Sequence, residues 1–176
     1  MRFVETKVAG AWLIEPEPIA DERGFFARTW CTAEFADHGL NPGLSQANIS
    51  YNHHKGTLRG LHYQQAPHTE AKLVRCTRGA IFDVAVDLRP ESPTYRGWFE
   101  VELSADNRAM LYVPEGCAHG FLTLTDAAEV AYQMSAPYAP AAATGVRFDD
   151  PAFGIEWPGE VLVINERDRG YPDVGP

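Results

Sequence analysis

Short runs of alternating apolar and polar residues recur along the chain, and this period of two predicts strands. The strongest run covers residues 71–88, where two alternating segments flank Arg78-Gly79, so we expect a hairpin-like pair of strands there. In the second segment the large apolar side chains share one face, while Asp83 and Asp87 share the other. These two carboxylates either border a site or face solvent, and the pattern leaves both interpretations open.

Similar but shorter runs predict the remaining strands, with turn residues between them. They cover residues 2–14, 25–30, 97–103, 109–113, 119–124 and 129–134. Thr32–Gly39 is typical of a helix, with Thr32 as the N-cap and Gly39 as the C-terminal stop. The 15 glycines and 13 prolines are scattered through the chain, which indicates many turns between short elements. The pattern therefore predicts an all-β protein, either a sandwich or a barrel.

Residues 57–64 form an alternating run that carries polar groups of chemical interest. Simple parity places Arg59 and His62 on opposite faces of a strand. Gly60 lies between them and can host a bulge that turns both side chains into one cavity. The alternative is a half-exposed strand with both side chains in solvent. A second run, Gln46–Tyr51, has polar side chains at every second position, and that face looks either at water or into a wet cavity.

Length and charge limit the classes of protein and partner. The 176 residues suit one domain, 1–176, with a loose tail from about residue 170. The net charge of -9 and the lack of a basic run argue against nucleic acid and anionic membranes, whereas a few arginines can still hold one small anion. No apolar run approaches the ~20 residues of a membrane helix. Three cysteines without metal-type spacing suit a reducing compartment, so we expect a soluble cytoplasmic protein with buried cysteines.

Several segments, in one order along the chain, resemble the dTDP-4-dehydrorhamnose 3,5-epimerase family. They are DERGFF at 21–26, LRGLHYQ at 58–64, KLVR at 72–75, FDVAVDLR at 82–89, SPT at 92–94, PEGCAHGF at 114–121 and DDP at 149–151. The resemblance implies a cupin-type jelly-roll barrel or sandwich with one or two short peripheral helices. It also implies a homodimer that exchanges N-terminal strands, and no metal or organic cofactor. The implied activity is an isomerase of deoxysugar (dTDP-rhamnose) biosynthesis, acting on a nucleotide-diphospho-4-keto-6-deoxyhexose, with dTDP-4-dehydro-6-deoxyglucose as the first expectation.

Epimerisation beside a ketone needs a base that removes a C–H proton, a group that stabilises the enolate oxygen, and an acid on the opposite face. A ketone at C4 acidifies both C3 and C5, so one site can invert both centres. His62 suits the base, because an ordinary imidazole with a pKa near ~6.5 accepts a proton at neutral pH. The resemblance implies Asp168 as its orienting partner, Lys72 at the enolate oxygen and Tyr132 as the acid, although a strand tyrosine is usually a buried aromatic.

The resemblance also implies which groups bind the nucleotide and the sugar. On the chain's own barrel these are Gln46, Asn48, Arg59, His119 and Tyr138. From the exchanged strands of the neighbouring subunit they are Arg23, which meets phosphate, and Phe26, which stacks on the base. Arg28 on the same segment is a further binding residue.

Arg28 is a departure from the family, which usually has Glu at this position to read thymine. A carboxylate accepts hydrogen bonds from a base N–H, whereas an arginine only donates. A CDP-linked sugar is therefore an alternative to dTDP, and so is dTDP with Arg28 turned toward solvent. Asn165 and Arg167 also depart from the family's usual Ser-Glu-Lys-Asp, in which Asp168 is retained.

Three alternatives to a 3,5-epimerase remain open. The same groups would serve an epimerase that inverts only C3 or only C5. A metal-dependent cupin oxygenase needs a His-x-His group with a nearby Glu, but the matching strand offers only His62-Tyr63-Gln64, which leaves too few ligands beside the second cupin motif at 114–119. A non-catalytic binding module for sugar nucleotides would have no use for an acid and a base on opposite faces.

Overall fold

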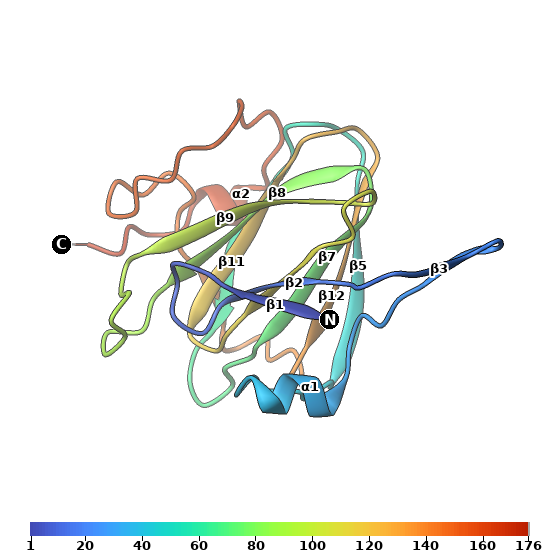
Figure 1. Ribbon diagram of the computed structural model, residues 1–176. Coiled ribbons are helices and arrows are strands. Elements are labelled where there is room, and N and C mark those ends of the chain that lie inside the picture. The colour runs from blue at the N-terminus through green and yellow to red at the C-terminus, as the bar shows by residue number, and fades with distance from the viewer. Residues whose placement is uncertain (176) are drawn as a thin grey trace.

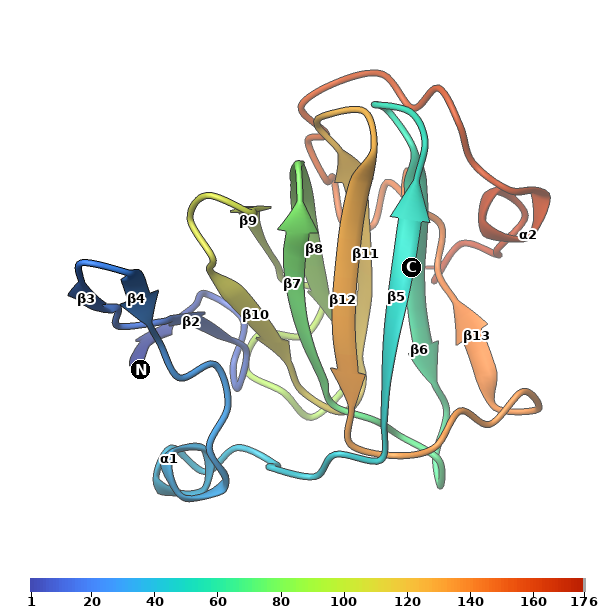
Figure 2. The ribbon, with the colours of Figure 1, turned by 90° about the vertical axis from the view of Figure 1, so that its right-hand side faces the viewer.

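The computed structural model describes residues 1–175 as two antiparallel sheets packed face to face, with a projecting hairpin (Figures 1 and 2). The six-stranded sheet has the order β1 (Arg2–Glu5), β2 (Trp12–Glu15), β10 (Met110–Val113), β7 (Lys72–Arg78), β12 (Ala128–Met134) and β5 (Gln46–Asn52). The five-stranded sheet has the order β13 (Ala143–Gly145), β6 (Leu58–Gln64), β11 (Cys117–Thr123), β8 (Ala80–Asp87) and β9 (Trp98–Ser104). The hairpin is β3 (Ile19–Asp21) with β4 (Gly24–Phe26), and the helices are α1 (Thr32–Asp37) and α2 (Glu166–Arg169). The predicted all-β architecture is confirmed.

Alternating side chains from both sheets fill the space between the sheets. Val74, Leu111 and Val130 of the six-stranded sheet form one cluster with Ile81 and Ala85 of the five-stranded sheet, and all five are fully buried. Burial of a Val, Leu or Ile side chain stabilises the fold by about 1.5–3 kcal/mol. This shared layer is therefore a main source of stability, and it holds the two sheets in a fixed relation.

Segments outside the sheets cover both outer faces. Phe35 of α1 packs with Ile14 and Tyr112 on the outside of the six-stranded sheet. The chain after β13 runs along the outside of the five-stranded sheet, where Phe153 belongs to one cluster with Val84. The chain after β13 thus wraps the barrel on this side.

The expected hairpin at residues 71–88 is wrong. Strands β7 and β8 follow each other directly, but they lie in different sheets, where β7 pairs with β10 and β12 and β8 pairs with β9 and β11. Gly79 joins them with a φ of 72°, a conformation that glycine adopts readily. Two alternating runs around a turn look the same whether the strands pair or stack across a core. Only the long-range partners decide between the two.

The segment that leads into helix α1 also differs from expectation. The strand expected over residues 25–30 ends at Phe26. The N-cap of α1 is Cys31 rather than Thr32, and its extended backbone carries no side-chain capping bond. Cys31 is half-buried, whereas Cys76 and Cys117 are buried as expected. Gly39 follows the helix with a φ of 69°, in agreement with its predicted role as the stop.

The residues that follow α2 are docked on the body of the protein. The side chain of Tyr171 is buried. Asp150 accepts a hydrogen bond of 2.6 Å from the backbone N–H of Val174, and Arg96 donates one of 2.9 Å to the carbonyl of Gly175. The expected loose tail is therefore held in place as far as residue 175, and Pro176 lies outside the described residues.

Asp87 accounts for the motif residues in the connection from β8 to β9. Its buried carboxylate accepts hydrogen bonds from the side chains of Arg89, Ser92 and Thr94. Arg89 also donates to the carbonyl of Ala9 at 2.6 Å, which ties this connection to the loop between β1 and β2. Asp87 therefore has a structural role, and it neither borders the cavity described below nor faces solvent.

We predict that Asp87→Asn lowers the free energy of unfolding by about 2 kcal/mol at pH 7. Burial opposes ionisation of Asp87, but the hydrogen bonds from Arg89, Ser92 and Thr94 outweigh it and lower its pKa to about 2 from an ordinary 3.8. A carboxyl with a lowered pKa stabilises the fold above its ordinary pKa, and this contribution disappears as the pH falls from about 4 to about 2. Urea unfolding at pH 7 and pH 3 measures the difference. Asp106→Asn, an exposed change, is the control and should leave the stability unchanged. Equal stability of Asp87→Asn and the native chain at pH 7 would contradict the prediction.

Candidate active site

A cavity of about 470 Å³ lies between the two sheets. Strands β5, β7 and β12 of one sheet and β6 and β11 of the other contribute to its wall, together with residues near β13 and α2. The polar and aromatic side chains among them are Ser50, Tyr51, Arg59, His62, Tyr63, Gln64, Glu70, Lys72, His119, Phe121, Tyr132, Tyr138, Thr144 and Arg167. Six of the predicted site residues therefore share one cavity: Arg59, His62, Lys72, His119, Tyr132 and Tyr138.

A bulge in β6 brings Arg59 and His62 to the same cavity. Opposite β11, His62 pairs with His119 and Arg59 pairs with Phe121, so β6 contains one more residue than its partner between the two pairs. Gly60 lies in this stretch with a φ of 119°, and a Cβ there would come within 2.7 Å of the His119 carbonyl oxygen. Only glycine suits this backbone. The interpretation that Gly60 overrides strand parity is confirmed.

His62 is held by a buried carboxylate from the other end of the chain. Its Nε2 lies 2.7 Å from Oδ1 of Asp168 in α2, and Oδ2 of Asp168 accepts the backbone N–H of Gly60 at 2.9 Å. Asn165 is the N-cap of α2, and its side chain accepts the backbone N–H of Asp168 at 2.6 Å. These bonds fix the position of the carboxylate. The family departure at Asn165 therefore preserves a capping function.

The charge of Asp168 determines which nitrogen of His62 carries the proton. Burial opposes ionisation of Asp168, but the hydrogen bond from His62, with smaller contributions from the Gly60 N–H and Arg167, leaves its pKa below the ordinary value. An ionised carboxylate only accepts hydrogen bonds, so Nε2 of His62 carries the proton that it donates. Nδ1 is left with a free lone pair. The pair can therefore present a base to a bound molecule.

Lys72 lies in the wall of the cavity on β7. Its side chain is almost completely buried, and its ammonium group pairs with the carboxylate of Glu70. Nζ also lies 3.5 Å from the carbonyl oxygen of His62. Burial lowers the pKa of Lys72, while Glu70 acts in the opposite direction. The cation is thus next to the base, and a buried acid compensates its charge.

Tyr132 approaches the cavity from the wall opposite His62. It lies on β12 of the six-stranded sheet, whereas His62 lies on β6 of the five-stranded sheet. Burial raises the pKa of its phenol, although Arg59 partly opposes this effect. A protonated phenol on one wall therefore faces an imidazole on the other.

His119 forms a second histidine–carboxylate pair beside the first. Its Nε2 lies 2.8 Å from Oδ1 of the fully buried Asp83 on β8. Burial raises the pKa of Asp83, and the interaction with His119 opposes this. The open question about this strand is thereby answered for Asp83, which supports a residue of the cavity. The alternation of β8 indicates the carboxylate, whereas its partner is visible only in the structure.

Two arginines of the cavity bind neutral acceptors. Arg59 donates to the side chain of Asn52 at 2.7 Å and to the carbonyl of Tyr51 at 3.4 Å. Arg167 donates to the carbonyl of Ala143 at 3.0 Å. Since no carboxylate among residues 1–175 shares these hydrogen bonds, both guanidinium groups can attract an anion. In the sequence Arg167 is visible only as a departure from the family, and its place in the cavity follows from the fold of α2.

A family model described as dTDP-4-dehydrorhamnose 3,5-epimerase matches residues 5–175. The chain belongs to this family. A curated dTDP-4-dehydrorhamnose 3,5-epimerase of Methanothermobacter thermautotrophicus is 47% identical over 173 residues, which are 97% of this chain and 92% of the relative. The predicted family, the cupin-type jelly roll and the class of enzyme, an isomerase, are confirmed.

Solved structures of family members superpose over nearly the whole chain. The dTDP-4-dehydrorhamnose 3,5-epimerase of Elizabethkingia anophelis has a TM-score of 0.95 at 39% identity, covering 99% of this chain and 96% of its own. A 3'-monoepimerase of Streptomyces bikiniensis, solved in complex with dTDP-quinovose, has a TM-score of 0.87 at 35% identity, covering 96% and 85%. The same fold therefore occurs in a 3,5-epimerase and in a 3'-monoepimerase.

The polar face of β5 is turned inward. Ile49 is 70% exposed on the outer face, whereas the neighbouring polar side chains are half-buried and Ser50 lines the cavity. Gln46 accepts the backbone N–H of Tyr138 at 2.8 Å and donates to Asn48 at 3.3 Å. Of the two interpretations of this strand, the inward-facing one is correct. Gln46 and Asn48 adjoin the cavity through Tyr138 rather than lining it.

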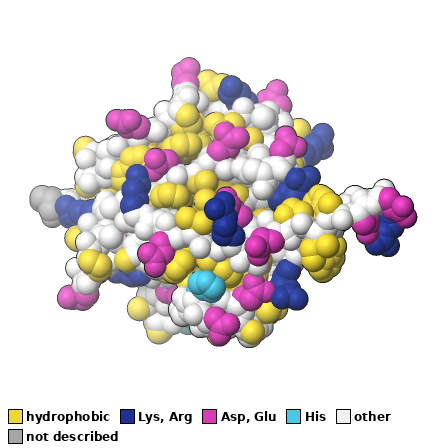
Figure 3. All heavy atoms as spheres, viewed as in Figure 1, with side chains coloured by type: hydrophobic (Ala, Val, Ile, Leu, Met, Phe, Trp, Pro, Cys, Tyr) yellow, Lys and Arg dark blue, Asp and Glu magenta, His cyan; other side chains and the backbone are white. Residues whose placement is uncertain are grey.

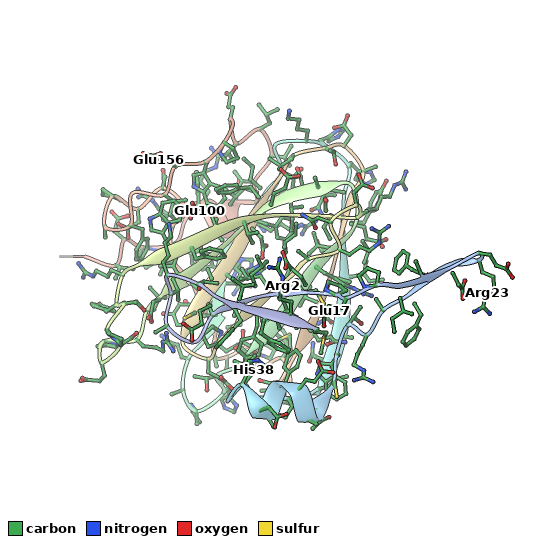
Figure 4. All side chains as sticks on the ribbon, viewed as in Figure 1. Arg2, Glu17, Arg23, His38, Glu100 and Glu156 are labelled. Atoms are coloured by element: carbon green, nitrogen blue, oxygen red, sulfur yellow. The ribbon has the colours of Figure 1, made fainter. Side chains whose placement is uncertain are left out.

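The predicted residues of the N-terminal segment do not reach this cavity. Figure 4 shows Arg23 at the tip of the β3–β4 hairpin, which projects away from the barrel, and there it pairs with Asp21 at 2.5 Å. Phe26 is 69% exposed on the same hairpin. Arg28 forms an ion pair of 2.7 Å with Glu34 of α1. Within one chain these three residues are separate from the catalytic candidates.

The described residues offer no alternative metal centre or membrane segment. Among residues 1–175 no three His, Cys, Asp or Glu side chains gather as a ligand set. Within the same range no helix has the length and apolar character required to cross a membrane. That the enzyme works without a metal or an organic cofactor remains a prediction.

Proposed function

We propose that the protein inverts C3 and C5 of dTDP-4-dehydro-6-deoxyglucose in deoxysugar biosynthesis. The observation that carries this proposal is that the His62–Asp168 pair, Lys72 and Tyr132 surround one cavity in a chain of this family. The proposal also draws on the relatives, whose names state this activity.

In the proposed reaction His62 removes the proton from the carbon beside the C4 ketone. The electron pair of the C–H bond moves to the C4 oxygen as an enolate, which Lys72 stabilises. Asp168 stabilises the imidazolium that forms. Tyr132 then donates its phenolic proton to the opposite face of the carbon and recovers a proton from solvent. The origin of His62 and Tyr132 on opposite sheets supports this stereochemistry, because the sugar ring would lie between them.

The nucleotide diphosphate is proposed to bind beside the catalytic groups. Arg59 and Arg167 supply cationic charge without carboxylate partners, and His119 adds a donor held by Asp83. Such groups suit the two phosphates of a sugar nucleotide. Tyr138, whose ring is about half exposed beside the cavity, is proposed to contact the nucleotide.

A homodimer with exchanged hairpins would complete the site. The β3–β4 hairpin exposes Ile19, Phe25 and Phe26, and Figure 3 shows hydrophobic side chains gathered on its inner part with charged residues at its tip. The edge strand β5 also exposes Ile49 and Tyr51. Exposed apolar surfaces of this kind favour association. Phe26 and Arg23 would then reach the nucleotide in the partner's cavity.

For the base we propose thymine, with Arg28 turned away from it. The ion pair of Arg28 with Glu34 supports this, because a guanidinium already bound to a carboxylate is less available to a base. A CDP-linked sugar is the alternative that the experiment below tests. The three cysteines are unpaired, which supports action in the reducing cytoplasm.

Deuterium exchange tests the proposed function directly. We would incubate dTDP-4-keto-6-deoxyglucose and its CDP counterpart separately with the enzyme in deuterated water and follow C3 and C5 by NMR. We expect deuterium at both carbons of the dTDP sugar. Exchange at one carbon would correct the regiochemistry, exchange of the CDP sugar alone would correct the base, and no exchange with either would overturn the proposal.

We predict that Tyr132→Phe separates proton removal from reprotonation. The variant keeps the aromatic ring but loses the proton that the phenol supplies, so product formation falls by ~10²-fold or more. Proton removal by His62 falls less. Product formation is measured by NMR of the sugar, and proton removal by the loss of a tritium label from the substrate. Equal losses in both steps, together with weakened dTDP binding, would assign Tyr132 a structural role.

A further inference from the structure

Each of three basic side chains in the cavity is backed by a buried carboxylate. His62 pairs with Asp168, His119 pairs with Asp83, and Lys72 pairs with Glu70. The first two pairs orient imidazole rings. The third pair is different because it joins two groups that are both ordinarily charged, and the proposed reaction leaves its acid without a role.

Glu70 is held as firmly as the other two acids. Its side chain is only 2% exposed. One oxygen accepts the backbone N–H of Gln64 at 3.1 Å, and the other pairs with the ammonium of Lys72. Gln64 is itself anchored, since its side chain donates to the carbonyl of His68 at 2.8 Å and accepts the backbone N–H of Ala139 at 2.6 Å. The carboxylate therefore has a fixed position relative to strand β6.

This arrangement fixes the ammonium group as well. Nζ of Lys72 contacts both the Glu70 carboxylate and the carbonyl oxygen of His62, and its distance to that carbonyl oxygen is 3.5 Å. An ammonium group has three N–H donors. With two directed at these acceptors, the third remains for a bound molecule, close to the residue that would remove the proton.

The surroundings of Lys72 decide what Glu70 contributes. A lysine buried without a counter-charge loses its proton readily, and its pKa falls by several units in extreme cases. The other titratable side chains that line the cavity are Tyr51, Arg59, His62, Tyr63, His119, Tyr132, Tyr138 and Arg167. The thiol of Cys117 on β11 also acts on Lys72. Burial raises the pKa of that thiol to about 12, so it supplies no negative charge at neutral pH. Asp168 and Asp83 hydrogen-bond to histidines, which leaves Glu70 as the carboxylate that contacts Lys72.

We propose that Glu70 is a positioning residue that keeps the Lys72 ammonium charged and directed at the oxygen where the enolate forms. This inference rests on the proposed function for its consequence in catalysis. Its physical part, control of the charge of Lys72, is independent of the substrate. Without Glu70, Lys72 would be neutral over part of the working pH range and would stabilise the enolate poorly.

The charge of Lys72 can be measured without substrate. The chain has only three lysines, Lys7, Lys55 and Lys72, so a protein labelled with ¹³C-lysine has three Cε signals to assign. In Glu70→Gln, which keeps the size of the side chain, the titration midpoint of Lys72 is expected to fall by about one pH unit or more. The midpoints of Lys7 and Lys55, which are exposed, should not change. An unchanged midpoint for Lys72 would overturn the proposal.

The pH profile of deuterium exchange tests the catalytic part. In Glu70→Gln the high-pH limb of kcat should move to lower pH, and kcat at pH 8 should fall ~10- to 100-fold, with KM changed less than kcat. Glu70→Asp retains the charge and should keep the limb of the native enzyme at a reduced kcat. Glu91→Gln, an exposed change in the connection between β8 and β9, is the matched control.

The outcomes separate this inference from the proposed function. Failure of the native enzyme to exchange either sugar would contradict the proposed function. The titration of Lys72, which needs no substrate, would still test whether Glu70 controls its charge. If the native enzyme is active and Glu70→Gln loses kcat equally at every pH, Glu70 is merely structural. Thermal melting of each variant identifies a loss of folding.

Discussion

Replacing His62 with Asn will reduce deuterium exchange at C3 and C5 by ~10³-fold or more while leaving dTDP binding within about threefold of the native value. Asn has no group that accepts a proton near neutral pH. Its amide ends near the position of Nδ1 and does not reach that of Nε2, which now bonds to Asp168 at 2.7 Å, so the carboxylate keeps the N–H of Gly60 and water can enter the space that the ring leaves. Exchange is followed by NMR in deuterated water, and dTDP binding by calorimetry.

The result for His62→Asn has a control within the same chain. His38 is an exposed histidine that is not among the residues lining the cavity, and Figure 4 shows it next to α1. His38→Asn should exchange deuterium like the native protein. If His62→Asn retains more than a tenth of the native exchange rate, another group removes the proton. Loss of dTDP binding along with exchange would instead show that the substitution disturbs the cavity as a whole.

Replacing Asp168 with Asn is the second large effect, with an expected fall in kcat of ~10²- to 10⁴-fold. The amide oxygen would keep the hydrogen bond from the backbone N–H of Gly60, now 2.9 Å from Oδ2. The amide nitrogen then faces His62, and because it only donates, Nε2 of His62 must accept. The imidazole proton moves to Nδ1, which removes the lone pair that the native tautomer presents to substrate. The variant therefore keeps its shape and loses its base.

NMR of ¹⁵N-labelled histidine distinguishes this tautomer effect from a loss of structure. In the native protein we expect the proton of His62 on Nε2, and in Asp168→Asn on Nδ1. Asp149→Asn changes an exposed carboxylate of the wrapping segment and should alter neither the tautomer nor kcat. A native tautomer in Asp168→Asn, combined with a low kcat, would mean that stabilisation of the imidazolium, rather than orientation, is what Asp168 supplies.

Local features of the sequence were sufficient to locate most of the strands and one unusual feature of the site. Alternation placed β7, β8, β9, β11 and β12 within about two residues of their observed ends. Gly60 between Arg59 and His62 indicated a bulge, and the register of β6 on β11 contains it. These predictions succeed because strand parity and the conformational freedom of glycine are properties of a few neighbouring residues.

The pairing of strands and the partners of buried groups could not be derived in this way. The turn at Gly79 suggested a hairpin, but β7 and β8 belong to different sheets. The interpretations of Asp83 as a site residue or a solvent-exposed residue were equally open until His119 was found beside it. Glu70 gave no local signal, although its partner Lys72 is two positions away, because the burial of the pair and the anchoring N–H of Gln64 arise only in the folded chain.

The sequence by itself determined the family, the all-β class and the identities of the base, its acid partner, the cation and the phenol as candidates. Tertiary structure alone decided that these groups meet, since His62 and Asp168 are 106 positions apart. It also decided that three bases each have a buried acid, while Arg59 and Arg167 have none. The physical reason is that periodicity reports which side of an element is buried. The charge of a side chain, the tautomer of a histidine and the groups that each can contact depend on what lies across the cavity.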